Sequence, residues 1–549
     1  MNLPQHVSLI VVGSGIAGLY AAVCAAEHAQ RHRTALPLLV TKDRLQDSNT
    51  WYAQGGIAAV SPDSVAAGDS IAAHIEDTLA AGAQAGHPAA VDVLCRESWQ
   101  DVHRLIALGT DFDRDGDRYA LGLEGAHRYA RILHHGGDAT GAGIARTLIA
   151  ACRQAEANGH LHIATEAFAT EVVTRGGAAT GVRLAVHGQP PVEVGSNAVL
   201  LATGGIGQAF AATTNPRGAT GDGAALAWRA GARLADAEFV QFHPTLVDTS
   251  ALTGRLPADR PALMVTEAVR GDGALLVDGT GTRFMPAIDA RAELAPRDVV
   301  ARAIHHARRT TGACWLDARP VERQRGTGYL AHRFPQLVAG LQHFDVDPAR
   351  EPIPVTEAQH YWMGGVATNL DGATEVPGLF AVGETAHTGA HGANRLASNS
   401  LTEALVFARR AVASALAGPP LGTPGEQRSE PAPRAPGSPA DSSAVTGQLV
   451  TAELARHVQE IASAELGVVR SAAGLRRALT ELNRLRAIAD ARVAAASGVD
   501  RAASELANRA LVASLIAEAA LARTDSLGAH CRLDATMDQE KVHEHLSHA

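Results

Sequence analysis

The chain has 549 residues, of which 46% are hydrophobic and 19% charged, so it can bury large cores and is not a disordered protein. Its formal net charge of −9 argues against a nucleic-acid partner, which selects for a basic surface. The five cysteines are scattered and form no CxxC pair. This argues against a zinc site, an iron–sulfur cluster and a disulfide framework, so we expect no metal and a reducing compartment.

The apolar segments are too short for a membrane protein. None approaches the roughly 18–20 residues that a spanning helix requires. The first apolar run, Val7–Val12, has no basic segment before it and leads directly into glycines, so it is not a signal peptide. We therefore predict a cytoplasmic protein with no membrane partner and, at roughly 150 residues per domain, about three to four domains.

The first predicted elements are a strand, a glycine turn, a helix and a second strand. Val7–Val12 is a β-type run, Gly13–Gly18 has the pattern GxGxxG, Leu19–Ala29 is helical, and Leu36–Val40 is again apolar. Such a turn brings backbone N–H groups and a helix N-terminus to the pyrophosphate of a dinucleotide. The usual acid for an NAD ribose is missing, because Asp43 comes slightly late after the second strand.

The central part of the chain changes its pattern three times. Residues 70–108 carry apolar residues at helical spacing, and residues 161–201 alternate between short strands and glycine-rich turns. Residues 238–354 mix loops and helices and contain more arginine and proline. A further strand, Leu379–Val382, opens into Gly383 and an acid.

The C-terminal part reads as helices separated from the rest by a linker. A helix is expected over about 401–416, and residues 417–445 are rich in proline, glycine and serine, which is typical of a flexible linker. Apolar residues then recur at helical spacing over 449–462, 472–496 and 501–523. The natural interpretation is a three-helix unit.

Three strand ends point to one long cofactor. Besides the first glycine turn, Ala202–Gly205 closes a strand in the middle of the chain, and Gly383 and Glu384 close the later one. A cofactor contacted by the beginning, the middle and the end of a domain is long, which favours FAD. Glu384 is suited to bind a ribitol hydroxyl of that cofactor.

Longer motifs at residues 48–58, 242–245, 266–271, 295–298, 360–366 and 391–401 resemble the succinate dehydrogenase/fumarate reductase flavoprotein superfamily. The resemblance covers about residues 5–416 and continues more weakly into the C-terminal helices. Residues 52–56 and 124–127 are most similar to the branch of the superfamily that oxidises L-aspartate.

The resemblance implies an α/β fold in which a Rossmann-like FAD-binding domain is interrupted by an α+β capping domain and followed by a C-terminal three-helix domain. The expected ranges are 1–237 and 355–416 for the FAD-binding domain, 238–354 for the capping domain, 417–445 for the linker and 446–549 for the helical domain.

The resemblance also implies where FAD binds and that it is bound noncovalently. Membrane-bound relatives attach FAD through a histidine at the position that Asn49 occupies here. The resemblance and the glycine turn together predict these cofactor-binding residues: Gly13, Ser14, Gly15, Ala17, Gly18, Lys42, Ser48, Asn49, Thr50, Trp51, Tyr52, Ala53, Gln54, Gly55, Gly56, Asp222, Glu384, Ser400 and Leu401.

Two histidines and two arginines suit a dicarboxylate. His243, His360, Arg297 and Arg395 all lie in turns marked by glycine or proline, and the arginine fork fits a carboxylate. The resemblance implies that His243 and Thr266 hold one carboxylate of the substrate, and that His360 and Arg395 hold the other.

Arg297 breaks a local rule. Pro296 favours a helix over 297–307, and a cation at its N-terminus opposes the helix dipole. Broken local rules are typical of functional sites. The resemblance implies that Arg297 is the catalytic acid/base and that Glu267 and Arg270 belong to its proton path.

Two further residues receive specific predictions. Ser400 and Glu403 have the spacing of a capping box, which would begin a helix directly after Arg395. Glu124 would repel a plain dicarboxylate but can accept a hydrogen bond from a substrate ammonium group, and the resemblance implies that catalytic role.

We therefore expect FAD-dependent oxidation of L-aspartate to iminoaspartate, with oxygen or fumarate as electron acceptor. The resemblance implies that the product feeds quinolinate and NAD biosynthesis, with a possible handover to a quinolinate synthase. The alternatives are a soluble fumarate reductase or succinate dehydrogenase flavoprotein and, in a different class, a non-catalytic FAD-binding protein whose helical tail recruits a partner.

Overall fold

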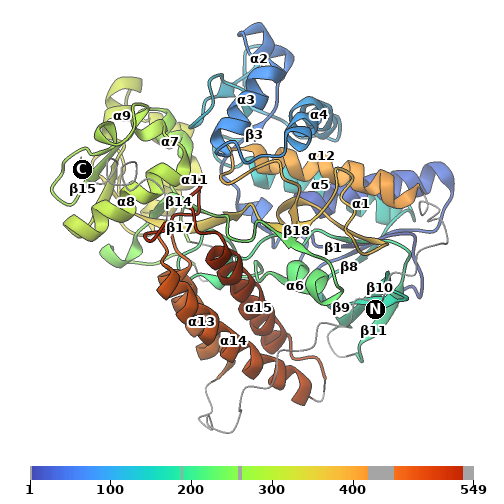
Figure 1. The fold of residues 1–549 in the computed structure, drawn as a ribbon. Helices are drawn as coiled ribbons and strands as arrows, with labels where there is room; N and C mark the ends of the chain where they lie inside the picture. Colours follow the sequence, from blue (N-terminus) through green and yellow to red (C-terminus); the bar gives the residue numbers. More distant parts are fainter. Residues whose placement is uncertain (1–2, 187–188, 258–261, 418–449, 497, 536–549) are drawn as a thin grey trace.

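The computed structural model describes residues 3–186, 189–257, 262–417, 450–496 and 498–535. The predicted linker at 417–445 therefore lies, except for its first residue, outside the described residues. Figure 1 shows a large α/β unit, a smaller unit that carries α7 to α11, and a bundle of three helices beside both. Within the described ranges, no helix is long and apolar enough to cross a membrane.

The large unit is organised around a parallel sheet. Its order is β19-β12-β1-β2-β8, with β1 at Ile10–Val12, β2 at Leu38–Val40, β8 at His162–Ala164, β12 at Val199–Leu201 and β19 at Leu379–Ala381. Both faces of the sheet are covered, because alternate residues of each strand enter different cores: Ile10 lies in one hydrophobic cluster and Val11 in the other. This explains the unbroken apolar runs in the sequence.

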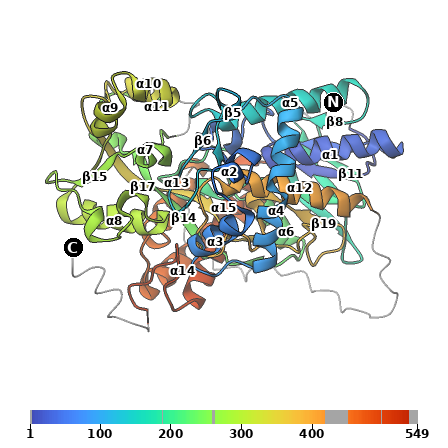
Figure 2. The same ribbon diagram turned by 90° about the horizontal axis from the view of Figure 1, so that it is seen from above.

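Helices cover one face of this sheet, and their apolar residues share one cluster with it (Figure 2). These helices are α1 (Ile16–His32), α4 (Pro88–Ala107), α5 (Thr140–Ala157) and α12 (Asn399–Leu416). Helix α3 (Ile71–Ala81) packs against α4, and the short α2 (Pro62–Ala66) precedes α3 in the chain. Smaller sheets join them: β3 (Ile57–Ala58), β7 (Ile132–Leu133) and β6 (Leu121–Gly122); β4 (Arg114–Asp115) and β5 (Arg118–Tyr119); β9 (Ala167–Arg175), β10 (Ala178–Val186) and β11 (Val192–Gly195); and β13 (Leu234–Ala235), β18 (Gly365–Ala367) and β20 (Ala386–His387).

The smaller unit is the capping unit, and it has its own hydrophobic core. Its antiparallel sheet has the order β14-β17-β16-β15, with β14 at Val240–Val247, β15 at Leu275–Asp278, β16 at Cys314–Asp317 and β17 at Ile353–Trp362. Its helices are α7 (Glu267–Gly271), α8 (Arg297–Thr311), α9 (Arg319–Arg325), α10 (Tyr329–Arg333) and α11 (Pro335–Gln342). The strand β17 crosses the predicted domain boundary at residue 354.

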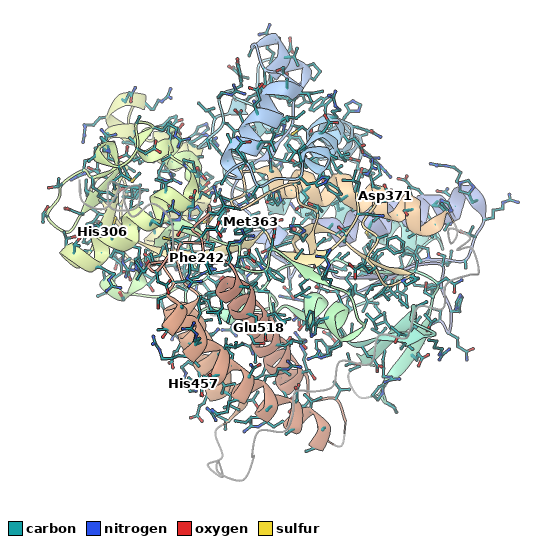
Figure 3. All side chains as sticks on the ribbon, in the orientation of Figure 1. Phe242, His306, Met363, Asp371, His457 and Glu518 are labelled. Atoms are coloured by element: carbon teal, nitrogen blue, oxygen red, sulfur yellow. The ribbon has the colours of Figure 1, made fainter. Side chains whose placement is uncertain are left out.

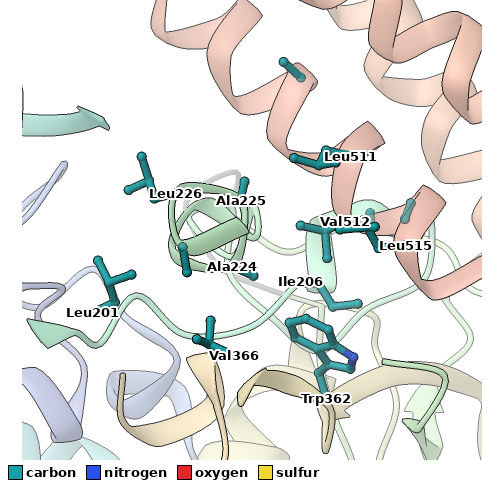
Figure 4. Packing of buried hydrophobic residues seen from close by; sticks show 14 of the residues in the cluster. Leu201, Ile206, Ala224, Ala225, Leu226, Trp362, Val366, Leu511, Val512 and Leu515 are labelled. Carbon is teal, nitrogen blue, oxygen red and sulfur yellow. The ribbon is translucent and has the colours of Figure 1, made fainter. Parts of the chain in front are cut away.

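The helical unit consists of α13 (Thr451–Glu465), α14 (Ala472–Ala495) and α15 (Arg501–Ala522), close to the helices predicted from apolar spacing. Helix α15 packs against α6 (Asp222–Arg229) of the large unit. Figure 4 shows Leu511 and Val512 of α15 facing α6 and Ile206. These residues belong to the same cluster as the central sheet, so the helical unit shares a core with the large unit.

The three units meet around β14 and β17. Figure 3 places Phe242 and Met363, which belong to these strands or directly follow them, at the centre of the molecule. Both side chains are buried. The strands that carry His243 and His360 therefore run through the junction between the units.

Candidate active site

A cavity of about 620 Å³ opens at the carboxyl ends of the parallel strands. Its wall includes Gly13 after β1, Thr41 after β2, Ala202 after β12 and Gly383 after β19. Ligands of open α/β sheets bind at this edge. Four strand ends on one elongated cavity fit the long cofactor that the sequence predicts.

The glycine turn has the geometry of a phosphate site. Gly13 has φ of 117°, and a Cβ there would collide with the carbonyl of Ala202. A Cβ on Gly18 would collide with the carbonyl of Gly13, so the third glycine allows helix and strand to pack closely. Helix α1 has no acidic residue in its first turn, and its N-cap residue Gly15 has no side chain, although the N–H of Ile16 donates to Thr50 Oγ1 at 2.9 Å. The helix dipole at this N-terminus therefore favours an anion.

Buried polar atoms in the wall indicate a ligand with donors and acceptors of its own. Ser48 Oγ, Asn49 Oδ1 and Gln54 Oε1 line the cavity and have no hydrogen-bond partner within the described part of the chain. Buried polar groups normally have partners. A flavin ring with its attached ribitol supplies such partners, so these residues fit FAD.

Most predicted cofactor residues lie in this wall. Those that line it are Gly13, Ser14, Gly15, Ala17, Lys42, Ser48, Asn49, Thr50, Trp51, Tyr52, Ala53, Gln54, Asp222, Glu384, Ser400 and Leu401. Gly18, Gly55 and Gly56 lie behind the wall. A Cβ on Gly56 would collide with Ile132, whereas one on Gly55 would lie 3.7 Å from Glu124 Oε1. Gly18 and Gly56 therefore permit close packing around the cavity, whereas Gly55 has room for a Cβ.

Glu384 links two parts of the wall. Its Oε1 accepts a hydrogen bond from the backbone N–H of Trp362 at 3.0 Å, and its Oε2 accepts one from the amide of Asn49 at 3.4 Å. Burial raises the pKa of Glu384 to about 7. The side chain lines the cavity, as expected for a residue that binds ribitol, and it also positions Asn49.

One end of the cavity leads to a group that we call the arginine–histidine cluster: His243, Glu267, Arg270, Arg297, His360 and Arg395. His360 and Arg395 line the cavity itself. The ring centres of His243 and His360 lie 5.0 Å apart, with an angle of 63° between the ring planes. The structure therefore brings together the polar residues that the sequence scatters over 150 positions.

Arg297 and Glu267 form the buried ion pair of this cluster. Arg297 begins α8, and its Nε donates to Glu267 Oε2 at 2.6 Å. Glu267 begins α7, and its Oε1 lies 3.5 Å from Arg270 NH2. Burial alone would raise the pKa of Glu267, but the two guanidinium groups hold it below its ordinary value. Burial lowers the pKa of Arg270.

The two histidines are neutral donors or acceptors. Burial, together with neighbouring positive groups, holds the pKa of His243 and that of His360 well below the ordinary value. His243 Nδ1 accepts from the backbone N–H of Thr245 at 3.2 Å, so the neutral ring carries its proton on Nε2. That Nε2 has no partner in the described ranges. His360 Nδ1 is 2.8 Å from the hydroxyl of Thr214.

The guanidinium of Arg395 is held by contacts with the protein, while one of its nitrogens has no partner in the described residues. Its NH1 donates to Ser400 Oγ at 3.3 Å, and its guanidinium lies 4.7 Å from the ring centre of Tyr361. Its Nε has no hydrogen-bond partner among the residues that the structure describes. Burial and Arg297 lower the pKa of Arg395 to about 10, so the group remains charged at neutral pH.

Glu124 is buried beside the arginine–histidine cluster. Ser398 Oγ donates to its Oε2 at 2.6 Å, whereas its Oε1 has no partner in the described chain. Burial and the nearby Glu267 carboxylate raise the pKa of Glu124. Thr266, predicted to bind the substrate, is also buried and directly precedes α7.

The predicted capping box is wrong. Helix α12 begins at Asn399, and the preceding residue is Ser398, which has φ of 61° and makes no capping bond. Ser400 lies inside the helix and accepts from Arg395, while Glu403 accepts from Tyr361 at 2.8 Å. The two side chains that would close the box are used for tertiary contacts instead.

Three site residues were missed in the sequence. The Oε1 of Gln241 accepts a hydrogen bond from Arg297 NH1 at 3.2 Å, and its Nε2 donates one to the carbonyl of Arg395 at 2.9 Å. Gln241 therefore connects both arginines. Ser398 and Tyr361 position Glu124 and Arg395 respectively. The only signal was the position of Gln241 in β14, two residues before His243 in a strand whose residues are all buried.

Within the described residues, no group of three or more histidine, cysteine or acidic side chains is arranged to hold a metal ion. The five cysteines, all of them in described ranges, form no disulfide.

Known proteins match the chain over nearly its whole length. The family model "FAD binding domain" matches residues 8–401, and "Fumarate reductase flavoprotein C-term" matches residues 455–548. An L-aspartate oxidase of Streptomyces coelicolor is 43% identical, covering 96% of this chain and 88% of the relative. One of Caulobacter vibrioides is 42% identical, covering 96% and 93%.

Solved structures share the fold. Quinol fumarate reductase FrdA of E. coli superimposes with a TM-score of 0.83 at 30% identity, covering 97% of this chain and 92% of that one. Sdh1 of Mycobacterium smegmatis gives 0.76 at 32% identity, covering 97% and 90%.

Fold and cavity thus define an FAD-binding flavoprotein of the fumarate reductase type, which confirms the predicted fold class. The sequence identity to L-aspartate oxidases over most of the chain also shows to which branch of this class the chain belongs. The chain belongs to the L-aspartate oxidase family.

Proposed function

We propose that this enzyme oxidises L-aspartate to iminoaspartate. The carboxylate of Glu124 is the observation that carries this proposal. It is buried next to the arginine–histidine cluster, and its Oε1 lacks a partner in the described structure. An acid in this place disfavours succinate but accepts a hydrogen bond from the ammonium group of an amino acid. The relatives named L-aspartate oxidase support the same substrate.

The cluster has donors for both carboxylates of aspartate. His243 Nε2 and the hydroxyl of Thr266 hold one carboxylate, while His360 and the charged Arg395 hold the other. The unused Nε of Arg395 and the unused Nε2 of His243 support this assignment. Because these donors are buried, their bonds to a substrate are stronger than they would be in water.

Arg297 is the group that gives or takes the proton. When bound, FAD supplies the acceptor for the hydride that leaves C2 of the substrate. Glu267 holds the Arg297 guanidinium at 2.6 Å, and Arg270 extends this contact away from the substrate. Glu124 orients the substrate nitrogen. Removal of the C2 hydride and one nitrogen proton then leaves iminoaspartate.

The cofactor is held noncovalently. The amide of Asn49, at the position where membrane-bound relatives have a histidine, lines the cavity and donates to Glu384. An amide is no nucleophile towards a flavin methyl group. Oxygen or fumarate restores the oxidised cofactor, and the reaction takes place in a reducing compartment such as the cytoplasm, in keeping with five free cysteines. We place the product in quinolinate and NAD biosynthesis, where a quinolinate synthase would receive it.

Two alternative functions can be distinguished from L-aspartate oxidation by the experiment described below. A soluble fumarate reductase would share the fold of the solved relatives, but Asn49 and Glu124 count against it. A non-catalytic flavoprotein would need neither the histidines nor the arginines of the cluster.

An anaerobic titration of the purified yellow protein with L-aspartate, D-aspartate and succinate tests the function. We expect L-aspartate to bleach the flavin absorption, and D-aspartate and succinate to bleach it little. Bleaching by succinate alone would favour the fumarate reductase alternative, and no bleaching at all would favour the non-catalytic one. Acid precipitation of the same preparation should release the yellow cofactor into solution, whereas a yellow pellet would contradict noncovalent binding.

A further inference from the structure

The cavity wall after β2 is supported by a helix from the far end of the chain. Lys42 and Asp43 line the cavity directly after this strand. Lys42 Nζ donates to Glu505 at 2.8 Å, and Arg501 donates to both carboxylate oxygens of Asp43 at 2.8 and 2.9 Å. Glu505 and Arg501 belong to α15, more than 450 residues away in the sequence.

The ammonium group of Lys42 is fully used by the protein. Besides Glu505, it donates to Thr220 and Asp222, each at 2.7 Å. A lysine has three N–H donors, so none remains for a cofactor phosphate. Lys42 therefore lines the cavity with its stem, while its charge connects the wall to α15.

One face of α15 makes all of these contacts. Arg501 also donates to the backbone carbonyl of Lys42 at 2.9 Å and to Glu505 at 3.0 Å. Asn508 donates to Asp222 Oδ1 at 2.7 Å. Positions 501, 505 and 508 follow helical spacing and so share a face.

Apolar packing fixes this face in place. Further along α15, Leu511, Val512 and Leu515 are buried in the cluster that includes α6 and the central sheet, as Figure 4 shows. Asp222 is the first residue of α6. The helix that carries Arg501 and the helix that carries Asp222 therefore form one rigid contact.

We propose that α15 is part of the FAD-binding site, where Arg501 neutralises Asp43 and thereby lets the wall accept a cofactor that carries two phosphates. This inference rests on the FAD cavity and not on the choice of substrate. Without Arg501, the carboxylate of Asp43 would face the cavity as an uncompensated negative charge. Like charges repel more strongly where water is partly excluded.

The test is the affinity of the apoprotein for FAD, measured by the quenching of flavin fluorescence. We expect Arg501→Gln to raise the dissociation constant about three- to fivefold, which corresponds to the loss of one partly exposed ion pair. The exposed Arg476→Gln on α14 is the matched control and should leave it unchanged. Adding Asp43→Asn to Arg501→Gln should restore most of the affinity, because the unpaired carboxylate is then gone.

Two results would overturn the proposal. One is a dissociation constant of Arg501→Gln within about twofold of the control, and the other is a double variant as weak as the single one. Thermal unfolding of the apoprotein shows whether Arg501→Gln folds. If Arg501→Gln does not fold, the single variant Asp43→Asn tests the proposal instead. We expect this variant to bind FAD at least as tightly as the unaltered protein does. Weaker binding would mean that the carboxylate itself holds the cofactor. None of these measurements requires turnover, so they stand whichever substrate is oxidised.

Discussion

We propose that Glu124 is the residue that separates an amino acid oxidase from a dicarboxylate reductase at this site. We predict that Glu124→Gln lowers kcat/KM for L-aspartate about 10- to 100-fold, because a hydrogen bond to a charged group is lost. Reduction of fumarate, which has no ammonium group, should change far less. Steady-state kinetics in both directions measures this, with the exposed Glu518→Gln as control. An equal loss in both directions would make Glu124 structural.

Acidification should imitate this substitution. Since burial raises the pKa of Glu124 above its ordinary value of 4.5, its carboxylate is protonated at a higher pH than that of an exposed glutamate. The KM for L-aspartate should therefore rise as the pH falls towards that raised pKa, and Glu124→Gln should lack this limb of the profile. A variant with the same acid limb would assign it to another group.

Arg297 is expected to matter for turnover and not for the cofactor. Lysine carries a compact charge and cannot reach Glu267 and Gln241 with a planar fork. We expect Arg297→Lys to keep its FAD and to lose about 10²- to 10⁴-fold in kcat, the range of general acid–base catalysis. The exposed Arg309→Lys on the same helix is the control. Near-normal turnover would remove Arg297 from the acid/base role.

Single residues were predictable where their function depends on local sequence. A broken helix rule singled out Arg297, the family resemblance supplied the roles expected of Arg297 and Glu124, and the structure places both side chains at the cluster. Glu403 was misjudged, because its partner Tyr361 lies 42 positions away. For Lys42, the sequence indicated the cavity but gave no sign of Glu505, 463 positions further on.

At the scale of elements, a turn after α15 contacts both sides of the active site. The backbone N–H of Ala529 donates to the carbonyl of Ala393 at 2.9 Å, two residues before Arg395. Arg302 of α8 donates to the carbonyl of Gly528 at 2.8 Å. The turn thus connects the loop that carries Arg395 to the helix that begins with Arg297.

Gly528 tests this connection. It has φ of 53°, and a Cβ would lie 2.6 Å from the carbonyl oxygen of Ala393. Gly528→Ala should push the two apart and raise the KM for L-aspartate several-fold, while the FAD content stays the same. Gly498→Ala, where a Cβ meets open space, is the matched control. An unchanged KM would show that the turn does not position Arg395.

Elements were predicted well where their pattern is strong. The helices of the C-terminal unit and the strand–turn–helix around Gly13 agree closely with the structure, because burial of one face imposes a period on the sequence. The boundary at residue 354 falls inside β17, because that strand continues from the capping sheet into the junction between the units. A sequence pattern marks where an element begins and ends, but not which units it joins.

At the scale of the whole molecule, the sequence suggested a helical domain separated by a linker, and the structure shows a helical unit that shares its core with the parallel sheet. The missing information was long-range pairing. Apolar residues on α15 predict that a face is buried, but they do not say that α6 and Ile206 lie against it.

This shared core also sets an order of events in the cell. It includes Val7 from the beginning of the chain and Ala520 from near its end, and α15 supplies the partners of Lys42 and Asp43. During synthesis, the glycine turn leaves the ribosome early, but the wall beside it has its partners only when α15 has emerged. We therefore expect the cofactor to be loaded late in biogenesis, after α15 has been translated.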